Sequence, residues 1–221
     1  MTMLILLPAV VLLVLLLLAE KKESIPGKLA TKPLLSALFL AVAWHAAWPV
    51  PGLARWVMAG LVLSWIGDVF LIFYARPLFM AGLLSFLSGH ICYAVGFLGH
   101  GTLPPVAVLG VALMAAVSVK IFFWLRPHLG PMAGPVMTYI AVITAMVAGA
   151  LSLFGTAHFP AAARWLVLGG ALLFYASDLL VARDRFVKNE FSNRLYGLPL
   201  YYAAQFFFAF AIGLMGPAAN G

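Results

Sequence analysis

Long apolar runs, separated by short stretches of proline, glycine and charged residues, make up most of this chain. About 20 apolar residues span a bilayer as a helix, and eight runs come close to that length. They predict helices over residues 3–19, 33–49, 54–74, 77–98, 104–124, 134–154, 162–182 and 196–215. Turn signals lie between them, among them Ile25-Pro26-Gly27 and the segment from Pro127 to Pro135. The pattern predicts one all-α domain over residues 1–221, a polytopic transmembrane bundle of about eight helices.

The composition supports a membrane protein. The 221 residues are 65% hydrophobic and only 9% charged, whereas soluble domains carry about 25% charged residues. The net charge of +7 does not indicate nucleic-acid binding, because the basic residues lie in short loops between apolar runs. Cys92 is the only cysteine, which excludes an intramolecular disulfide.

The basic residues also predict an orientation. Most of the 13 lysines and arginines lie in the loops that follow the first, third, fifth and seventh helices, or at the edges of those loops. Only Arg55 and Arg164 lie elsewhere. The first run has no basic residue before it and no A-x-A-like cleavage site, so it is expected to be a retained helix. By the positive-inside rule both termini lie outside the cytoplasm. We expect a multi-pass protein of the cell (inner) membrane.

Two parts of the chain resemble each other. Ala54-Arg55-Trp56 and Ala163-Arg164-Trp165 each open a predicted helix, and an aspartate follows each tryptophan, as Asp68 and Asp178. The two helices are four apart and therefore parallel. This similarity suggests two four-helix halves with the same topology, as in many membrane proteins that bind a ligand near their centre.

Asp68 and Asp178 are the most informative positions, because each lies inside an apolar run. A carboxylate within the bilayer costs roughly 2.5–3.5 kcal/mol on insertion scales and usually faces a bundle interior or a wet cavity. The alternative is an aspartate held by hydrogen bonds at a helix contact. Both aspartates are expected roughly 6–9 Å from the cytoplasmic face, from a rise of about 1.5 Å per residue.

Other polar residues are predicted near this depth. Tyr201 and Gln205 are one turn apart on the last helix, and Lys32 stands at the mouth of the second. His90 and Tyr93 share a face of the fourth helix, but the rise per residue places them about 10 Å deeper than the aspartates. For these residues, hydrogen bonding between helices and, for Lys32, an interfacial position are the alternatives to a role in a site.

Sequence motifs indicate a family. GDVFLIF followed by FMAGLLSFLSGHICYAVGF resembles the first signature of the YhhN-like lysoplasmalogenase family, and SDLLVARDRF followed by YYAAQ resembles the second. The resemblance implies a membrane hydrolase without a cofactor, which cleaves the vinyl-ether bond of lysoplasmalogens to a fatty aldehyde and a glycerophospho-head group. Its partners would be the lysophospholipid substrate and membrane lipids. The signature positions are Asp68, His90, Tyr93, Asp178, Tyr201 and Gln205.

The aspartates fit this chemistry. Protonation of a vinyl ether gives an oxocarbenium ion, to which water adds before the hemiacetal collapses. Glycosidases handle a related cation with two carboxyl groups. We therefore expect one of Asp68 and Asp178 to be the general acid and the other the stabiliser or base, with Lys32 near the lipid phosphate.

Rival interpretations remain open. Intramembrane aspartates also carry protons in small transporters or flippases, and a structural or sensory protein would use them for packing alone. A metal site of Asp68, Asp178 and His90 is conceivable, but no H-E-x-x-H motif accompanies them, and no metal is expected. The absence of G-x-S-x-G leaves a serine lipase unsupported. The sequence leaves the oligomeric state open.

Overall fold

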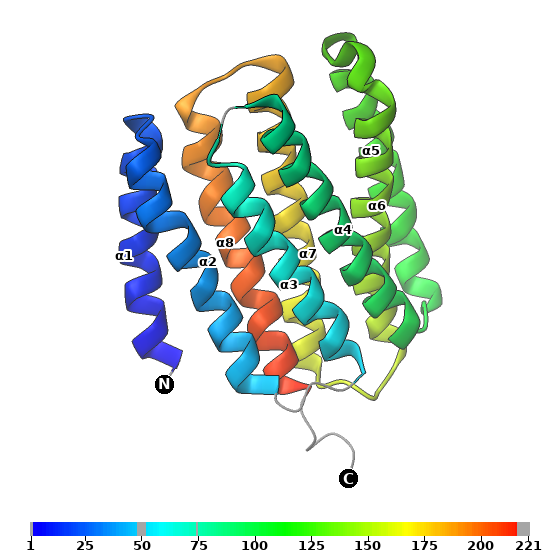
Figure 1. The fold of residues 1–221 in the computed structure, drawn as a ribbon. Coiled ribbons are helices and arrows are strands. Elements are labelled where there is room, and N and C mark those ends of the chain that lie inside the picture. The colour runs from blue at the N-terminus through cyan, green and yellow to red at the C-terminus, as the bar shows by residue number, and fades with distance from the viewer. Residues whose placement is uncertain (1, 48–51, 74, 216–221) are drawn as a thin grey trace.

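Helical backbone forms almost all of the chain, as expected where no water can satisfy exposed backbone groups. The computed structural model describes residues 2–47, 52–73 and 75–215. Its α-helices are α1 (Thr2–Lys21), α2 (Ile25–Ala47), α3 (Leu53–Phe70), α4 (Arg76–His100), α5 (Pro105–Leu129), α6 (Ala133–Ser152), α7 (Ala161–Ala182) and α8 (Phe191–Leu214). They run alternately up and down, so α1 begins and α8 ends at the same end of the bundle (Figure 1).

The predicted helical bundle is confirmed, but not as eight separate segments. Gly130–Met132 forms a 3-10 turn that joins α5 to α6 without an intervening non-helical residue. The described residues therefore form seven continuous helical segments, and six of these are long and apolar enough to cross a membrane. Gly130 has φ 50, a conformation that glycine adopts at little cost, and here it lets the chain reverse within three residues.

The predicted start of the second helix was wrong. Residues Ile25 to Gly27, expected to be a turn, form the first turn of α2. The Ser24 hydroxyl accepts a hydrogen bond from the Gly27 backbone N–H at 3.2 Å, as an N-cap residue does, and proline is well tolerated at this position. Lys32 therefore lies two turns inside α2 and is buried, not at a helix mouth.

Other helix ends also differ from the predicted spans. α3 ends at Phe70 and α8 begins at Phe191, while the helical backbone of α7 continues beyond Ala182 through a π-helical turn, Arg183–Val187. The last residues of the predicted spans 33–49 and 54–74 lie outside the described residues, as does the tail after residue 215. The predicted spans were otherwise placed correctly to within a few residues.

The packing of the helices is similar in the two halves of the chain. α3 packs on α4 and α7 packs on α8, whereas α1 lies against α2 and α5 against α6 (Figure 1). α2 packs on α8, and the corresponding α6 packs on α4. The two halves therefore interlock, each placing its second helix against the last helix of the other.

Close contacts support the predicted duplication. Gly60 on α3 lies against the ring of Tyr93 on α4, and Gly170 on α7 lies against the ring of Phe208 on α8. Gly60 and Gly170 are separated by the same number of residues as Asp68 and Asp178. The duplication stays a prediction, and this shared register of small and aromatic residues is what supports it.

Gly60 provides a test of this packing. A methyl group added at Gly60 would overlap the Tyr93 ring, which is fully buried against Phe97, Phe174 and Phe208 and has no room to move. We expect Gly60→Ala to lower the free energy of unfolding in mixed micelles by about 1–3 kcal/mol. Gly99→Ala is the matched control, since a methyl group there meets nothing within 4 Å. Equal stabilities of the two variants would contradict the tight α3–α4 contact.

Candidate active site

Asp68 lies near the end of α3 and is buried by α2 and α8. Its Oδ2 accepts hydrogen bonds from the Ser36 and Tyr201 hydroxyls, both at 2.6 Å. Its Oδ1 lies 3.2 Å from the Lys32 ammonium group, and both side chains are less than a tenth exposed. Asp68 is therefore a carboxylate whose charge is balanced by a buried cation.

Asp178 on α7 has a different environment. Its Oδ2 accepts a hydrogen bond from the Tyr139 hydroxyl of α6 at 2.9 Å and lies 3.4 Å from His90 Nε2 of α4. Its side chain is 18% exposed, against 2% for Asp68. Among the described residues no lysine or arginine lies within 4 Å of it. Asp178 is thus the more accessible carboxyl group, and it has no cationic lysine or arginine to balance it.

The hydrogen bonding of His90 leaves its Nε2 facing Asp178. His90 Nδ1 lies 2.8 Å from the Phe86 carbonyl oxygen. A carbonyl only accepts hydrogen bonds, so Nδ1 must carry the proton. In a neutral ring Nε2 is then an acceptor, and it makes no hydrogen bond within the described part of the chain. It lies 3.4 Å from Asp178 Oδ2, so the two groups form a pair suited to sharing one proton.

The expected depth difference between His90 and Asp178 was wrong. The prediction ended the seventh helix at Ala182, but helical backbone continues to Val187. These five additional residues place Asp178 about 7 Å farther from the helix end than expected, at a rise of about 1.5 Å per residue. This accounts for most of the expected difference of about 10 Å, and the 3.4 Å separation of His90 Nε2 from Asp178 Oδ2 shows that the two side chains meet.

Tyr93 and Gln205 form a separate pair. The Tyr93 hydroxyl donates to Gln205 Oε1 at 2.9 Å, and both side chains are fully buried. Neither borders the cavities described below. The structure therefore brings Lys32 and Tyr201 to Asp68, and His90 to Asp178, while Tyr93 and Gln205 bridge α4 and α8 behind them.

The two aspartates have corresponding neighbours. Asp68 on α3 receives its partners from α2 and α8, and Asp178 on α7 receives its partners from α6 and α4. These helix sets correspond under the four-helix repeat, but the chemistry differs. The partners of Asp68 include a lysine, and those of Asp178 include a histidine.

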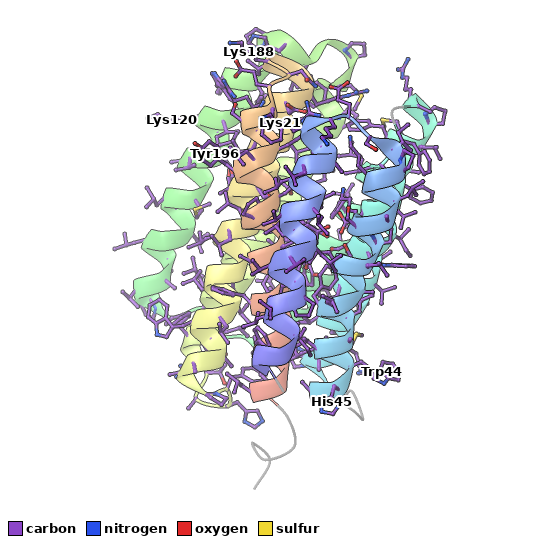
Figure 2. The ribbon with its side chains drawn as sticks, turned by 90° about the vertical axis from the view of Figure 1, so that its left-hand side faces the viewer. Lys21, Trp44, His45, Lys120, Lys188 and Tyr196 are labelled. Carbon is purple, nitrogen blue, oxygen red and sulfur yellow. The ribbon has the colours of Figure 1, made fainter. Side chains whose placement is uncertain are left out.

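Both aspartates border one cavity. It has a volume of about 210 Å³ and is lined by residues from the ends of α1, α7 and α8, including Glu20, Asp184 and Arg194. This end of the bundle, which carries Lys21, Lys120 and Lys188, is called the basic end here, and it lies opposite Trp44 and His45 (Figure 2). The cavity extends from the basic end to the two carboxyl groups.

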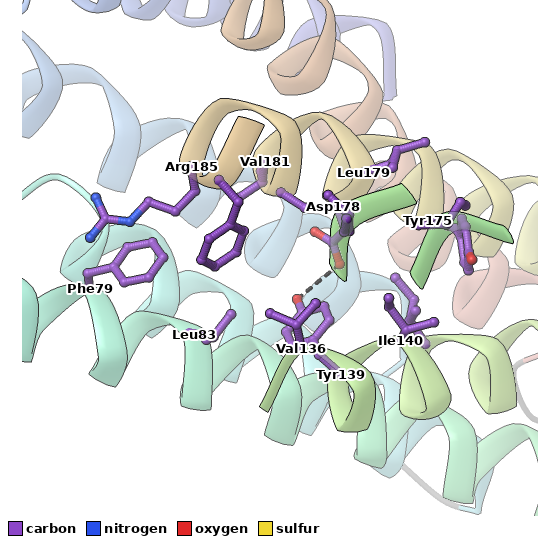
Figure 3. A pocket seen from close by; sticks show the side chains of 15 residues that line it. Phe79, Leu83, Val136, Tyr139, Ile140, Tyr175, Asp178, Leu179, Val181 and Arg185 are labelled. Carbon is purple, nitrogen blue, oxygen red and sulfur yellow. Dashed lines mark hydrogen bonds between the residues drawn. The ribbon is translucent and has the colours of Figure 1, made fainter. Parts of the chain in front are cut away.

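A second, apolar pocket meets this cavity at Asp178. It lies between α4, α5, α6 and α7, and Figure 3 shows Leu83, Val136 and Ile140 around the Tyr139–Asp178 hydrogen bond. Six residues border both spaces: Phe79, Leu83, Tyr139, Asp178, Val181 and Arg185. Asp178 thus stands where a polar chamber joins an apolar one.

Sequence reasoning missed two direct partners of the aspartates, Ser36 and Tyr139. Ser36 is one turn after Lys32 on α2, a spacing that could have indicated it. Tyr139 is a polar residue within the apolar run of α6, at the corresponding helix of the second half. The predicted repeat, applied to the neighbours of the aspartates, would have pointed to that helix.

Asp68, Asp178 and His90 are not arranged as a metal site. Within residues 2–47, 52–73 and 75–215, no group of three or more histidine, cysteine, aspartate or glutamate side chains is arranged to hold a metal ion. His90 and Asp178 meet, whereas the neighbours of Asp68 are Lys32, Ser36 and Tyr201.

The fold and site define a multi-pass helical membrane protein with two carboxyl groups, one buried and one partly exposed, on an amphipathic cavity. Residues 27–212 match the model of the YhhN family, and the chain belongs to that family. It is 36% identical over 157 residues to lysoplasmalogenase TMEM86A of Bos taurus, covering 69% of this chain and 63% of the relative. It is 31% identical over 186 residues to a lysoplasmalogenase of Mycobacterium bovis, covering 79% and 64%.

A third relative, lysoplasmalogenase TMEM86B of Homo sapiens, is 32% identical over 158 residues, covering 71% of this chain and 63% of the relative. The chain thus spans less than two thirds of the length of these relatives. No solved structure matches the chain.

Proposed function

We propose that this protein hydrolyses the vinyl-ether bond of lysoplasmalogen-type lysophospholipids, with Asp178 and Asp68 as its working carboxyl groups. The observation that carries the proposal is the position of Asp178, where an apolar pocket meets a polar cavity. A lysoplasmalogen has its reactive bond at the same kind of boundary, between an alkenyl chain and a glycerophospho-head group. The names of the relatives agree with this substrate class.

In this proposal Asp178 is the general acid. The proton held between Asp178 and His90 transfers to the carbon β to the ether oxygen, and the adjacent carbon becomes an oxocarbenium ion. Asp178 is then a carboxylate beside the cation. A positioned proton donor of this kind contributes about 100- to 10,000-fold to the rate.

Water completes the reaction. It adds to the oxocarbenium carbon and gives its proton to the Asp178 carboxylate, which restores the acid. The resulting hemiacetal breaks its bond to the glycerol oxygen, which takes up the hydroxyl proton, and a fatty aldehyde and a glycerophospho-alcohol leave. Asp68 borders the same cavity and is the proposed stabiliser of the cation, while Lys32 keeps it ionised so that it does not compete for the proton.

The orientation is part of the proposal. The cavity opens at the basic end, which the positive-inside rule assigns to the cytoplasm. Substrate would therefore enter from the cytoplasmic leaflet, with both ends of the chain on the other side.

The test is aldehyde release by purified protein in detergent. From an alkenyl lysophosphoethanolamine we expect one fatty aldehyde and one glycerophosphoethanolamine for each substrate consumed, without added metal, nucleotide or gradient. Glu23→Gln, which alters an exposed acid in the turn after α1, is expected to leave the rate unchanged. Absence of release by the folded wild-type protein would contradict the proposal.

A transporter would give a different result. Its intramembrane carboxyl groups would support proton-coupled uptake or counterflow in sealed liposomes, and no bond would break. Measuring intact lipid and aldehyde in the same liposome preparation separates the two functions.

A further inference from the structure

The charged residues around the polar cavity are paired, with one exception. Its basic lining residues are Lys28, Lys32, Arg185 and Arg194. Lys28 lies 2.8 Å from a Glu20 carboxylate oxygen, Lys32 lies 3.2 Å from Asp68, and Arg194 lies 3.6 Å from Glu20. Arg185 has no acidic partner within 4 Å in the described part of the chain. It is the uncompensated positive charge of this lining.

The acidic lining residues leave no carboxylate for Arg185. Glu20 and Asp68 are held by the cations above, and Asp184 accepts hydrogen bonds from Asn193 and the Glu190 backbone N–H. Asp178 faces His90 and Tyr139 instead. The exposed Arg185 is therefore available to an anion that enters the cavity.

Arg185 is held in place by an aromatic ring. Its guanidinium carbon lies 4.1 Å from the centre of the Phe79 ring on α4, and the two side chains lie side by side at one end of the apolar pocket (Figure 3). Stacking of this kind orients the planar guanidinium and leaves its N–H donors free to bind an oxyanion. The residue belongs to a π-helical turn, a rare conformation that is frequent at functional sites.

The distance from Arg185 to Asp178 suits one class of anion. The two residues are seven apart on one continuous helical segment and border the same two cavities, so their backbones are about 10 Å apart along the axis. In a lysoplasmalogen seven bonds separate the carbon that is protonated from the phosphorus, which is roughly 8 Å when extended at the spacing of a polypeptide backbone. The flexible arginine side chain covers the difference.

We propose that Arg185 binds the phosphodiester of a lysophospholipid and thereby sets the position of its alkenyl ether at Asp178. The proposal rests on the proposed function for the identity of the reacting bond. Arg185 acts as a positioning residue that reads the head-group phosphate, with the chain in the apolar pocket and the head group in the polar cavity.

Lys32 is not the phosphate ligand in this arrangement. It was the residue that the sequence indicated for this role, but its ammonium group is buried and occupied by Asp68. Arg183, two residues before Arg185, is likewise engaged, with Glu190 and Asn193. Basic loops are also attracted to the membrane surface in general, but that attraction does not require an arginine to border both cavities, as Arg185 does.

The experiment compares two substrates that differ only in the phosphate group. For Arg185→Gln, we expect KM for an alkenyl lysophosphoethanolamine, expressed as mole fraction in mixed micelles, to rise about 10- to 100-fold, as for loss of a charge-assisted hydrogen bond. KM for the alkenylglycerol of the same chain length should stay within twofold of wild type. For the phosphate substrate, the KM of Arg185→Lys should lie between the KM of Arg185→Gln and that of wild type.

Arg126→Gln is the matched control. It removes an exposed arginine in the last turn of α5, at the same end of the bundle but on neither cavity. Both substrates should keep their wild-type KM in this variant. An equal loss for both substrates in Arg185→Gln, or no change for the phosphate substrate, would overturn the proposal.

Binding of an uncleavable analogue separates this proposal from the proposed function. A saturated alkyl lysophosphoethanolamine should bind wild-type protein and lose about 10- to 100-fold in affinity with Arg185→Gln, whereas the alkylglycerol should bind both alike. This result supports the phosphate site even if no aldehyde is ever released. Displacement of the analogue by inorganic phosphate at equal concentration would assign the site to a free anion and overturn the lipid proposal.

Discussion

Replacing Asp178 by asparagine is expected to lower kcat for aldehyde release by about 100- to 10,000-fold, the usual contribution of a general acid. Asparagine keeps the shape of the side chain and can still accept the Tyr139 hydrogen bond, but it holds no proton that it could transfer. The measurement is the initial rate of aldehyde release at saturating substrate. KM should change little, because the chain and head group bind elsewhere in the cavities.

Two comparisons make this prediction specific. Asp178→Asn should keep the elution profile and thermal unfolding midpoint of the wild-type protein, so that loss of activity is not loss of structure. His90→Gln should lower the rate less than Asp178→Asn, because it removes the partner that shares the proton and leaves the carboxyl group. Full activity of Asp178→Asn would remove the aspartate from the mechanism.

Replacing Lys32 by methionine is expected to lower the free energy of unfolding by about 3–5 kcal/mol, since it leaves a buried carboxylate without its cation. Ser36 and Tyr201 would still donate hydrogen bonds to Asp68, but they carry no charge to balance it. The measurement is equilibrium unfolding of purified protein in mixed micelles. Lys188→Met is the control, because the Lys188–Glu190 ion pair is largely exposed and should contribute little to stability.

The double variant Lys32→Met, Asp68→Asn tests the same pair. With both charges removed, the stability should return most of the way to that of wild type, and the difference from the sum of the single changes measures their coupling. A single Lys32→Met variant as stable as Lys188→Met would show that Asp68 does not depend on the lysine.

The sequence predicted correctly that both aspartates face the bundle interior, but it misplaced Lys32 at a helix mouth, for a physical reason. A carboxyl group in an apolar run is costly wherever it lies, so Asp68 and Asp178 stand out without any knowledge of their neighbours. A lysine near a helix end has two favourable positions, at the interface or in an ion pair. Only the start of α2 at Ile25, set by the Ser24 cap, places Lys32 beside Asp68.

His90 shows the same limit at a helix end. Its distance from Asp178 was misjudged because no sequence pattern indicated that helical backbone continues through the π-helical turn to Val187. Helix ends depend on caps and on contacts with other helices, and are the least certain part of any sequence-based prediction. An error of five residues changed the expected depth of Asp178 by about 7 Å, which is enough to place two contacting side chains at different levels of the bundle.

The sequence by itself determined that this is a helical membrane bundle with two acidic groups in its interior, because length, apolarity and the cost of a buried charge are properties of each segment alone. It also indicated the family through local motifs. Only the tertiary structure decided the partners of each aspartate. Those contacts join residues from different helices, as Lys32 to Asp68 and His90 to Asp178, and no single segment contains the information that fixes their separation.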